Sequence, residues 1–312
     1  MKRSTHLFAC LMLTLAACTP QQSGPQPQAD ASATPDTLNV ADAAIAGGDP
    51  SMALSVSQSV LQTDSNNVDA LIHEGDAYYA LQRCTDAVAA YTLALKADPK
   101  SSAAETGLGR CLLKTDPKAA EAALTLAVQD NPGNAAALDD LGIARDLQGN
   151  FAGAVAPYQQ ALLAQPGSVA AEVNLGLSLA LSGNGPEALQ YLGPLATGPD
   201  ATARIRENYA AALVASGRDD EARQVLNIDL PPDQVGSAMA GFTAILATPN
   251  SPYPHPPAAS PGSPRWKVLL QETEAAACKR ASVSSRPSAA MVASIPGLMV
   301  LPVSAARTGW AT

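Results

Sequence analysis

The sequence predicts an all-α fold in which pairs of helices stack one after another as a solenoid. Of the 312 residues, 47% are apolar but only 4% are aromatic, so alanine and leucine must fill most of the core. Both residue types favour helices, whereas sheets favour β-branched and aromatic residues. A period of 33 or 34 residues, which indicates a repeat architecture, supports the same prediction. This period separates Pro99, Pro132 and Pro166, and also Gly75, Gly109, Gly142 and Gly176.

The residues at this period resemble the tetratricopeptide repeat, a 34-residue unit of two helices, A and B. One unit starts at Val68 and another at Ala135, while Glu74 departs from the pattern because position 7 is usually leucine. The resemblance implies a right-handed superhelical solenoid of about five or six helix pairs over residues 34–230. The matches at signature positions are Leu71, Gly75, Tyr78, Ala87, Tyr91, Ala94 and Pro99 in the first unit, and Leu138, Leu141, Gly142, Ala154, Tyr158, Ala161 and Pro166 in the second.

The pattern also places the contacts and the ends of each helix pair. Small residues at positions 8 and 20 let helices A and B approach closely, and proline at position 32 follows helix B, where no backbone N–H is needed. After the last unit, Val235, Met239, Phe242 and Ile245 are spaced by four, three and three residues, which predicts a helix with one apolar face. We expect this helix to cap the C-terminal end of a solenoid that spans residues 38–246.

The N-terminus predicts export and lipid attachment. Two basic residues precede a short apolar run, so residues 1–17 indicate a signal peptide that is too short to span a bilayer. Leu15-Ala16-Ala17-Cys18 resembles the bacterial lipobox, which implies cleavage before Cys18 and acylation of that residue. A buried cysteine in an ordinary signal peptide is the alternative. Because Thr19 rather than aspartate follows Cys18, similarity to enterobacterial lipoproteins implies a lipid anchor at the periplasmic face of the outer membrane.

Two segments have compositions typical of disorder. Residues 18–37 are rich in Pro, Gln, Ser and Ala, which predicts a flexible tether from Cys18. Residues 247–312 are rich in Pro, Ser and Ala, and from residue 249 onward six basic residues stand against two acidic ones, although the whole chain carries −9. We predict a disordered tail here. A divergent or out-of-frame terminus and a basic contact to cell wall or membrane are the alternatives.

The sequence offers little for catalysis, metal binding or nucleic-acid binding. His73 and His255 are isolated, and we find no zinc-ligand spacing, nucleophile elbow or phosphate-binding loop. We therefore predict no enzyme activity, no metal and no cofactor. The excess of 28 acidic over 19 basic residues argues against a nucleic-acid partner. No uninterrupted 18-residue apolar run lies beyond the N-terminus, which argues against a polytopic membrane protein.

Two cysteines lie where a disulfide could join consecutive units. Cys84 is near the start of one helix B, and Cys111 is near the end of the next helix A. Consecutive antiparallel helices bring these ends together, and an exported protein meets an oxidising compartment. We therefore predict a Cys84–Cys111 disulfide, with two buried free thiols as the alternative.

The concave face of the repeat solenoid is the predicted binding site for a protein partner. Helix A of each unit lines this face, and the side chains at positions 2, 5, 9 and 12 are expected to face the groove. The lining is apolar with acidic residues, which favours an extended or helical partner with basic and apolar side chains. A solvated acidic face without a partner is the alternative. The residues expected in this groove are Asp69, Ile72, Asp76, Tyr79, Asp139, Ile143, Asp146, Arg204 and Glu207.

The closing segment is similar to the end of TadD proteins, the tetratricopeptide lipoproteins of the tight-adherence (Flp) pilus system. The resemblance rests on the runs Ile205-Arg206-Glu207-Asn208-Tyr209-Ala210, Gly217-Arg218, Glu221-Ala222 and Asp229-Leu230-Pro231-Pro232. Tyr209 and Gly241-Phe242 depart from the family, which tends to have leucine and paired tyrosines there.

This resemblance implies a non-enzymatic outer-membrane lipoprotein that serves as a scaffold in Flp pilus assembly and export. Its partners would be the secretin or other pilus assembly components, and it would meet the membrane through its N-terminal lipid. The alternative is a general envelope adaptor for periplasmic peptidases, cell-wall enzymes or outer-membrane protein assembly. A repeat domain that serves a fused enzyme is a further alternative.

Overall fold

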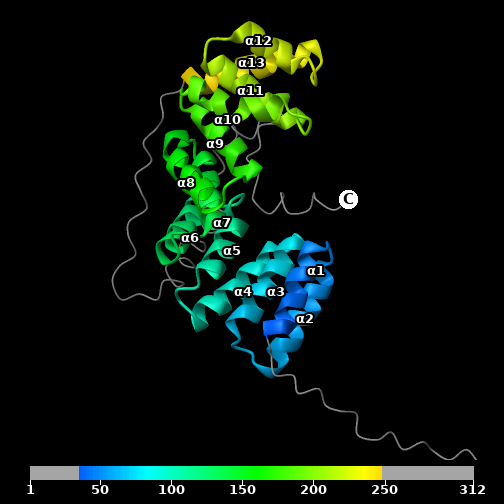
Figure 1. Cartoon of the computed structure of the whole chain (residues 1–312). Coiled ribbons are helices and arrows are strands. Elements are labelled where there is room, and N and C mark those ends of the chain that lie inside the picture. The colour runs from blue at the N-terminus through cyan, green and yellow to red at the C-terminus, as the bar shows by residue number, and fades with distance from the viewer. Residues whose placement is uncertain (1–34, 248–312) are drawn as a thin grey trace, which may run out of the picture. The chain divides into compact units, whose positions relative to one another are not determined.

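The computed structural model describes residues 35–247 and folds this part of the chain into thirteen helices without a strand (Figure 1). The all-α prediction is therefore confirmed. The predicted signal peptide, Cys18, the tether as far as residue 34 and the tail from residue 248 lie outside the described residues. The helices are α1 (Pro35–Ala46), α2 (Pro50–Thr63), α3 (Val68–Ala80), α4 (Cys84–Ala97), α5 (Ser102–Leu112), α6 (Pro117–Asp130), α7 (Ala135–Asp146), α8 (Phe151–Ala164), α9 (Val169–Leu181), α10 (Gly185–Thr197), α11 (Ala203–Ala215), α12 (Asp219–Leu226) and α13 (Pro232–Ala247).

The first twelve helices form six pairs of consecutive helices. Each odd-numbered helix from α1 to α11 packs against its even-numbered partner and also against the next odd-numbered helix. Among the described helices, successive even-numbered helices make no comparable contact. One cluster of buried apolar side chains runs from Leu71 on α3 to Ala212 on α11. The odd-numbered helices therefore form a continuous layer, as expected when each pair buries its apolar face on its neighbours.

Side-chain caps mark the start of the odd-numbered helices from α3 to α11. The side chain of Asn67 accepts a hydrogen bond from the backbone N–H of Ala70 at 3.0 Å, which satisfies one of the unpaired donors of α3. The same role recurs every 33 or 34 residues. The remaining caps of this set are Ser101, Asn134, Ser168 and Thr202.

The turn inside a helix pair usually contains one residue with positive φ. Gly149 and Gly183 take φ values of 77° and 89°, which glycine adopts at little cost. Gln82 holds the same place between α3 and α4 at φ 60°, an uncommon conformation for a residue with a side chain. The turn between α5 and α6, residues 113–116, contains no such residue.

Glycines on the odd-numbered helices allow the two helices of a pair to approach closely. A methyl group on Gly142 of α7 would lie 2.5 Å from the ring of Tyr158 on α8. A methyl group on Gly75 of α3 or on Gly107 of α5 would likewise overlap the ring of Tyr91 on α4. Both tyrosine rings are fully buried. The tyrosine ring therefore occupies the space that a side chain on the glycine would need.

Pro157 lies inside α8, where a proline is uncommon. A proline has no N–H, so the carbonyl four residues earlier loses its helical partner. That carbonyl belongs to Gly153, and it accepts a hydrogen bond from Nη1 of Arg145 at 2.9 Å. Arg145 also donates from Nε to Glu121 on α6 at 2.9 Å. One arginine therefore joins three helices and replaces the missing backbone bond.

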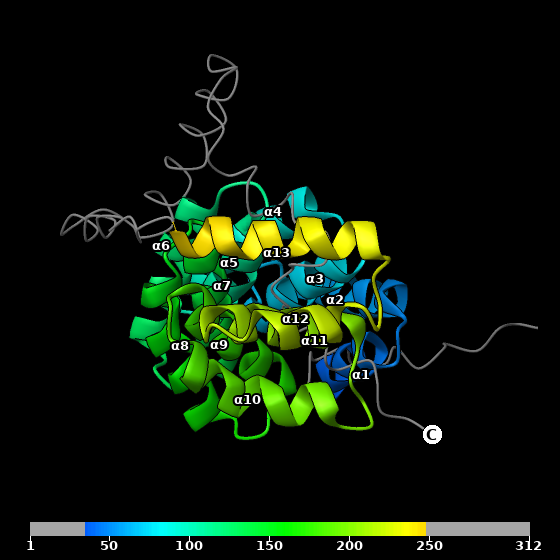
Figure 2. The same ribbon diagram turned by 90° about the horizontal axis from the view of Figure 1, so that it is seen from above.

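The last helix caps the C-terminal end, as predicted, but it also covers part of the odd-numbered layer. α13 packs against α9, α11 and α12 (Figure 2). Its buried residues Met239 and Phe242 share a cluster with Leu177 of α9 and Ala211 of α11. Leu177 and Ala211 both occupy position 9, one of the positions predicted to face the groove. The chain therefore occupies the C-terminal part of its own predicted binding face.

We expect Gly142→Ala to lower the free energy of unfolding by about 1–3 kcal/mol, because the new methyl group overlaps the buried Tyr158 ring. Urea denaturation followed by circular dichroism measures the change. The control is Gly236→Ala on α13, where no atom lies within 4 Å of the added methyl group. It should be neutral or stabilising by up to about 1 kcal/mol. Equal losses in the two variants would contradict the packing argument.

Candidate functional site

The structure leaves only part of the predicted groove accessible. Asp69 on α3 is exposed, while Ile72, Asp76 and Tyr79 on the same helix are half-buried. Arg204 on α11 is also half-buried. Four of the accessible residues therefore gather on α3, at the opposite end of the repeat series from α13. Partner binding by these residues stays a prediction.

The other four predicted groove residues have buried side chains. Asp139 and Asp146 are 0% and 2% exposed, and Ile143 and Glu207 are also buried. This differs from the expectation that they face an open groove. The reason is that adjacent odd-numbered helices pack directly on one another, so a side chain between them is covered by the next repeat. A partner cannot contact Asp139 or Asp146 while the repeats are stacked.

The buried acids of α7 bond to neighbouring odd-numbered helices instead. Nε of Arg110 on α5 donates to Asp140 Oδ2 at 2.8 Å, and the Asp140 side chain has no exposed surface. Nδ2 of Asn174 on α9 lies 3.3 and 3.4 Å from the two carboxylate oxygens of Asp139. These pairs connect three successive repeats. The sequence signal that could have revealed them is a polar residue at position 9 of one unit, at positions 5 and 6 of the next unit and at position 6 of the unit after that.

Asp146 is the third buried acid on α7. Its Oδ2 accepts hydrogen bonds from the hydroxyls of Ser178 on α9, at 2.6 Å, and Tyr158 on α8, at 2.8 Å. Burial raises the pKa of Asp146 to about 8, although both hydrogen bonds favour the ionised form. The pKa of Asp139 is also raised well above its usual range by burial and by the neighbouring charge of Asp140. These groups hold repeats together and do not form a binding surface.

At the accessible end, aromatic and charged side chains of α3, α4 and α5 lie close together. The Tyr91 hydroxyl donates to Asp76 Oδ1 at 2.6 Å. Burial raises the pKa of Asp76, and the Tyr91 hydrogen bond opposes this shift. The guanidinium of Arg110 lies 5.7 Å from the centre of the Tyr79 ring, within the range of a cation–π contact. The accessible groove residues are therefore held in place by the second and third repeats.

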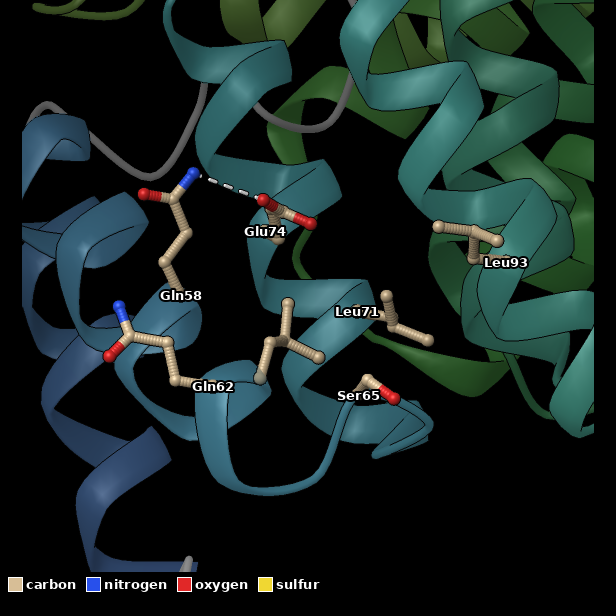
Figure 3. A pocket seen from close by; sticks show the side chains of 7 residues that line it. Gln58, Gln62, Ser65, Leu71, Glu74 and Leu93 are labelled. Atoms are coloured by element: carbon tan, nitrogen blue, oxygen red, sulfur yellow. Dashed lines mark hydrogen bonds between the residues drawn. The ribbon is translucent and has the colours of Figure 1, made fainter.

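A cavity of about 410 Å³ opens between α2 and α4, with α3 at its base (Figure 3). The repeat pattern did not predict this cavity. Glu74, which departs from that pattern at position 7, forms part of its wall. Apolar and polar side chains share the lining. They are Gln58, Leu61, Gln62, Ser65, Leu71, Glu74 and Leu93.

The structure places Cys84 and Cys111 in contact, as the antiparallel helices predicted. Cys84 is the first residue of α4 and is half-buried, and Cys111 is buried near the end of α5. Both are free thiols in the structure. Burial raises the pKa of the Cys111 thiol, and a hydrogen bond with Cys84 raises it further. The disulfide itself stays a prediction.

The described residues contain neither a cluster of metal ligands nor a helix that could cross a membrane. Between residues 35 and 247, we find no group of three or more His, Cys, Asp or Glu side chains placed to hold a metal ion. In the same range, none of the helices combines the length and the apolar character that crossing a bilayer requires.

Comparison with known families identifies the repeat. The tetratricopeptide repeat model matches residues 38–102, 72–136, 114–168 and 140–203, which together cover more than half of the chain. The chain belongs to the tetratricopeptide repeat family. No curated protein matches the sequence.

Two solved structures share the fold of this tetratricopeptide protein. PilW, described as a widely conserved type IV pilus biogenesis factor, is 22% identical, with a TM-score of 0.55 over 66% of this chain and 97% of PilW. PilF from Pseudomonas aeruginosa is 16% identical, with a TM-score of 0.53 over 76% of this chain and 96% of PilF. At these identities the similarity concerns the fold alone.

The buried Asp146 predicts that stability falls as pH rises from about 4 to about 8. An aspartate in the unfolded chain loses its proton near pH 4, whereas Asp146 in the folded chain keeps its proton up to about pH 8. Between these values the folded state binds the extra proton, so the free energy of unfolding falls by at most about 1.4 kcal/mol per pH unit from this group. Urea denaturation at pH 5, 7 and 9 measures this slope.

The variant Asp146→Asn should flatten the slope and leave the contribution of Asp139, whose pKa is also raised. Asp233→Asn is the control, because Asp233 is an exposed aspartate on α13. An unchanged slope in Asp146→Asn would show that Asp146 is ionised in the folded state at neutral pH.

For the cysteine pair, we expect an intramolecular disulfide in protein purified from an oxidising compartment. It closes a loop of 27 residues and, in the chain-entropy model, contributes about 3–4 kcal/mol to stability. The measurement is the thiol count of denatured protein with and without prior reduction, together with urea denaturation in both states. Cys84→Ser should abolish the difference, while Cys278→Ser should keep it. Equal thiol counts in the wild-type chain would refute the bridge.

Proposed function

We propose that this chain is a lipid-anchored scaffold at the periplasmic face of the outer membrane that acts in Flp pilus assembly and export. The tetratricopeptide fold is typically a non-catalytic scaffold for protein interactions, and this general role follows from the family. The lipid anchor at Cys18, the Flp system and the secretin as partner are the specific parts of the proposal. The observation that carries them is the combination of a lipobox with the TadD-like closing segment.

Residues from separate runs of the TadD-like segment contact each other in the structure. The guanidinium of Arg206 on α11 makes two hydrogen bonds with the carboxylate of Asp229, at 2.6 and 2.7 Å. Asp229 directly precedes the turn into α13, so this pair ties the last helix to α11. The hydrogen bonds from Arg206 lower the pKa of Asp229. The matching residues therefore fix the end of the solenoid.

The fold of PilW adds support of a general kind. PilW is a pilus biogenesis factor with the same fold, although its pilus is of type IV and its identity to this chain is 22%. A solenoid of this kind is therefore compatible with a role in pilus assembly.

In our proposal, the partner binds on the face formed by the odd-numbered helices, close to α3, because α13 covers that face at α9 and α11. The residues that would contact the partner are Asp69, Ile72, Asp76 and Tyr79.

Deletion of the gene should abolish Flp pili, and the wild-type gene should restore them. Cys18→Ser should fail to restore pili and should lose incorporation of radiolabelled palmitate, because it removes the acyl-accepting thiol. Cys278→Ser is the control and should behave as wild type. Intact pili in the deletion strain would refute the pilus role, and palmitate incorporation that survives Cys18→Ser would refute the anchor.

The partner surface is tested by charge reversal at an exposed site. Asp69→Lys should reduce capture of the secretin from solubilised envelopes, because it places a positive charge where we expect a basic partner. Glu187→Lys is the control, since Glu187 is an exposed acid on the even-numbered helix α10. Equal capture by both variants would show that the α3 surface does not contact the secretin.

A further inference from the structure

The cavity between α2 and α4 arises at the unit that starts at Val68, which has a carboxylate at position 7. In the next three units this position holds Leu108, Leu141 or Leu175, and all three side chains are buried. In the second repeat it holds Glu74, which is half-buried and lines the cavity. A carboxylate therefore stands where the next three units place a leucine side chain between neighbouring helices.

Glu74 is held in place but only partly engaged by its neighbours. Its Oε1 accepts a hydrogen bond from Nε2 of Gln58 on α2 at 3.1 Å, and the same nitrogen lies 3.3 Å from the Tyr78 hydroxyl. Its other oxygen, Oε2, makes no hydrogen bond to any residue in the described range. Gln58 therefore fixes the carboxylate while leaving one oxygen for a ligand.

The rest of the lining is amphipathic. Leu71 forms a buried floor, and Leu93 on α4 is 47% exposed at the rim. Figure 3 shows these two leucines across the cavity from Gln58 and Gln62, with Ser65 at one end. The opening lies between two even-numbered helices, which do not pack on each other. It is therefore separate from the odd-numbered face described above.

We propose that this cavity binds a lysine or arginine side chain from a protein partner. The methylene groups of such a side chain would cover Leu71 and Leu93, as long basic side chains commonly do on apolar surfaces. Its charged end would pair with Oε2 of Glu74, and the side-chain oxygens of Gln62 and Ser65 would accept its remaining hydrogen bonds. A purely apolar side chain would leave the carboxylate without a partner.

The charge of the molecule favours the same occupant. The chain carries −9 overall, which attracts basic segments and repels acidic ones. The site needs no change of the repeat stack, because Glu74 is already positioned by Gln58. The proposal is independent of the pilus role: the probe below is a synthetic peptide, so failure here leaves the pilus assays unaffected.

The test is an NMR titration of the full ¹⁵N-labelled chain with the peptide acetyl-Ala-Ala-Lys-Ala-Ala-amide. We expect saturable shifts of the side-chain amide signals of Gln58 and Gln62, with a dissociation constant on the order of 1–10 mM for one side chain. The same peptide with norleucine in place of lysine keeps the methylene groups and loses the charge. It should bind at least about tenfold more weakly.

Two variants of the protein separate the site from general charge attraction. Glu74→Gln keeps the shape and should weaken lysine-peptide binding at least about tenfold, since it removes the charge partner. Glu74→Leu restores the repeat pattern and should abolish binding while the helical circular dichroism spectrum is kept. Glu187→Gln removes an exposed charge of the same kind on α10 and should leave binding unchanged.

Three outcomes would overturn the proposal. These are equal binding of the norleucine peptide, equal weakening by Glu74→Gln and Glu187→Gln, and no shift at Gln58 or Gln62 up to about 20 mM peptide, which is above the expected dissociation constant. The first would indicate a purely apolar pocket, and the second a general electrostatic effect. The third would show that the cavity does not take a basic side chain.

Discussion

The stack of helices depends on the contact between a glycine on one helix and a large side chain on its partner. Gly142 lies against Tyr158, and Gly109 and Gly176 lie in the same way against Leu124 and Leu192. Each contact leaves no room for a methyl group, so it sets the distance between the two helices of a pair. That distance decides where the next pair can pack. The low aromatic content of the chain follows from it, because alanine fills the remaining close contacts.

This constraint explains why the fold could be predicted from the sequence and why the groove could be predicted only in part. Glycine, tyrosine and proline at fixed positions specify local contacts, and Pro99, Pro132 and Pro166 all lie just beyond a helix end. Exposure at positions 5, 9 and 12 depends instead on how closely successive odd-numbered helices approach. Ile72 and Asp139 both occupy position 5, yet Ile72 is half-buried and Asp139 is fully buried.

The departures from the repeat pattern depend on partners that are distant in sequence. Pro157 is tolerated inside α8 because Arg145, on the preceding helix, donates to the carbonyl that the proline leaves unpaired. The buried carboxylate of Asp140 is tolerated because Arg110, thirty residues earlier on the neighbouring helix α5, donates a hydrogen bond to it. Propensity rules describe each residue in its own segment, so they cannot supply these partners. Such partners could be found by looking for complementary polar residues in neighbouring units of the sequence, because the repeat fixes which positions face each other.

The position of α13 also constrains how this chain can change in length. α13 contacts both α9 and α11, so these two helices must stay adjacent for α13 to dock. A helix pair duplicated between α10 and α11 would separate these two contacts and leave the apolar side of α13 uncovered. A pair duplicated before α9 would leave them intact. Repeat gain and loss in the lineage of this protein should therefore be confined to the N-terminal side of α9.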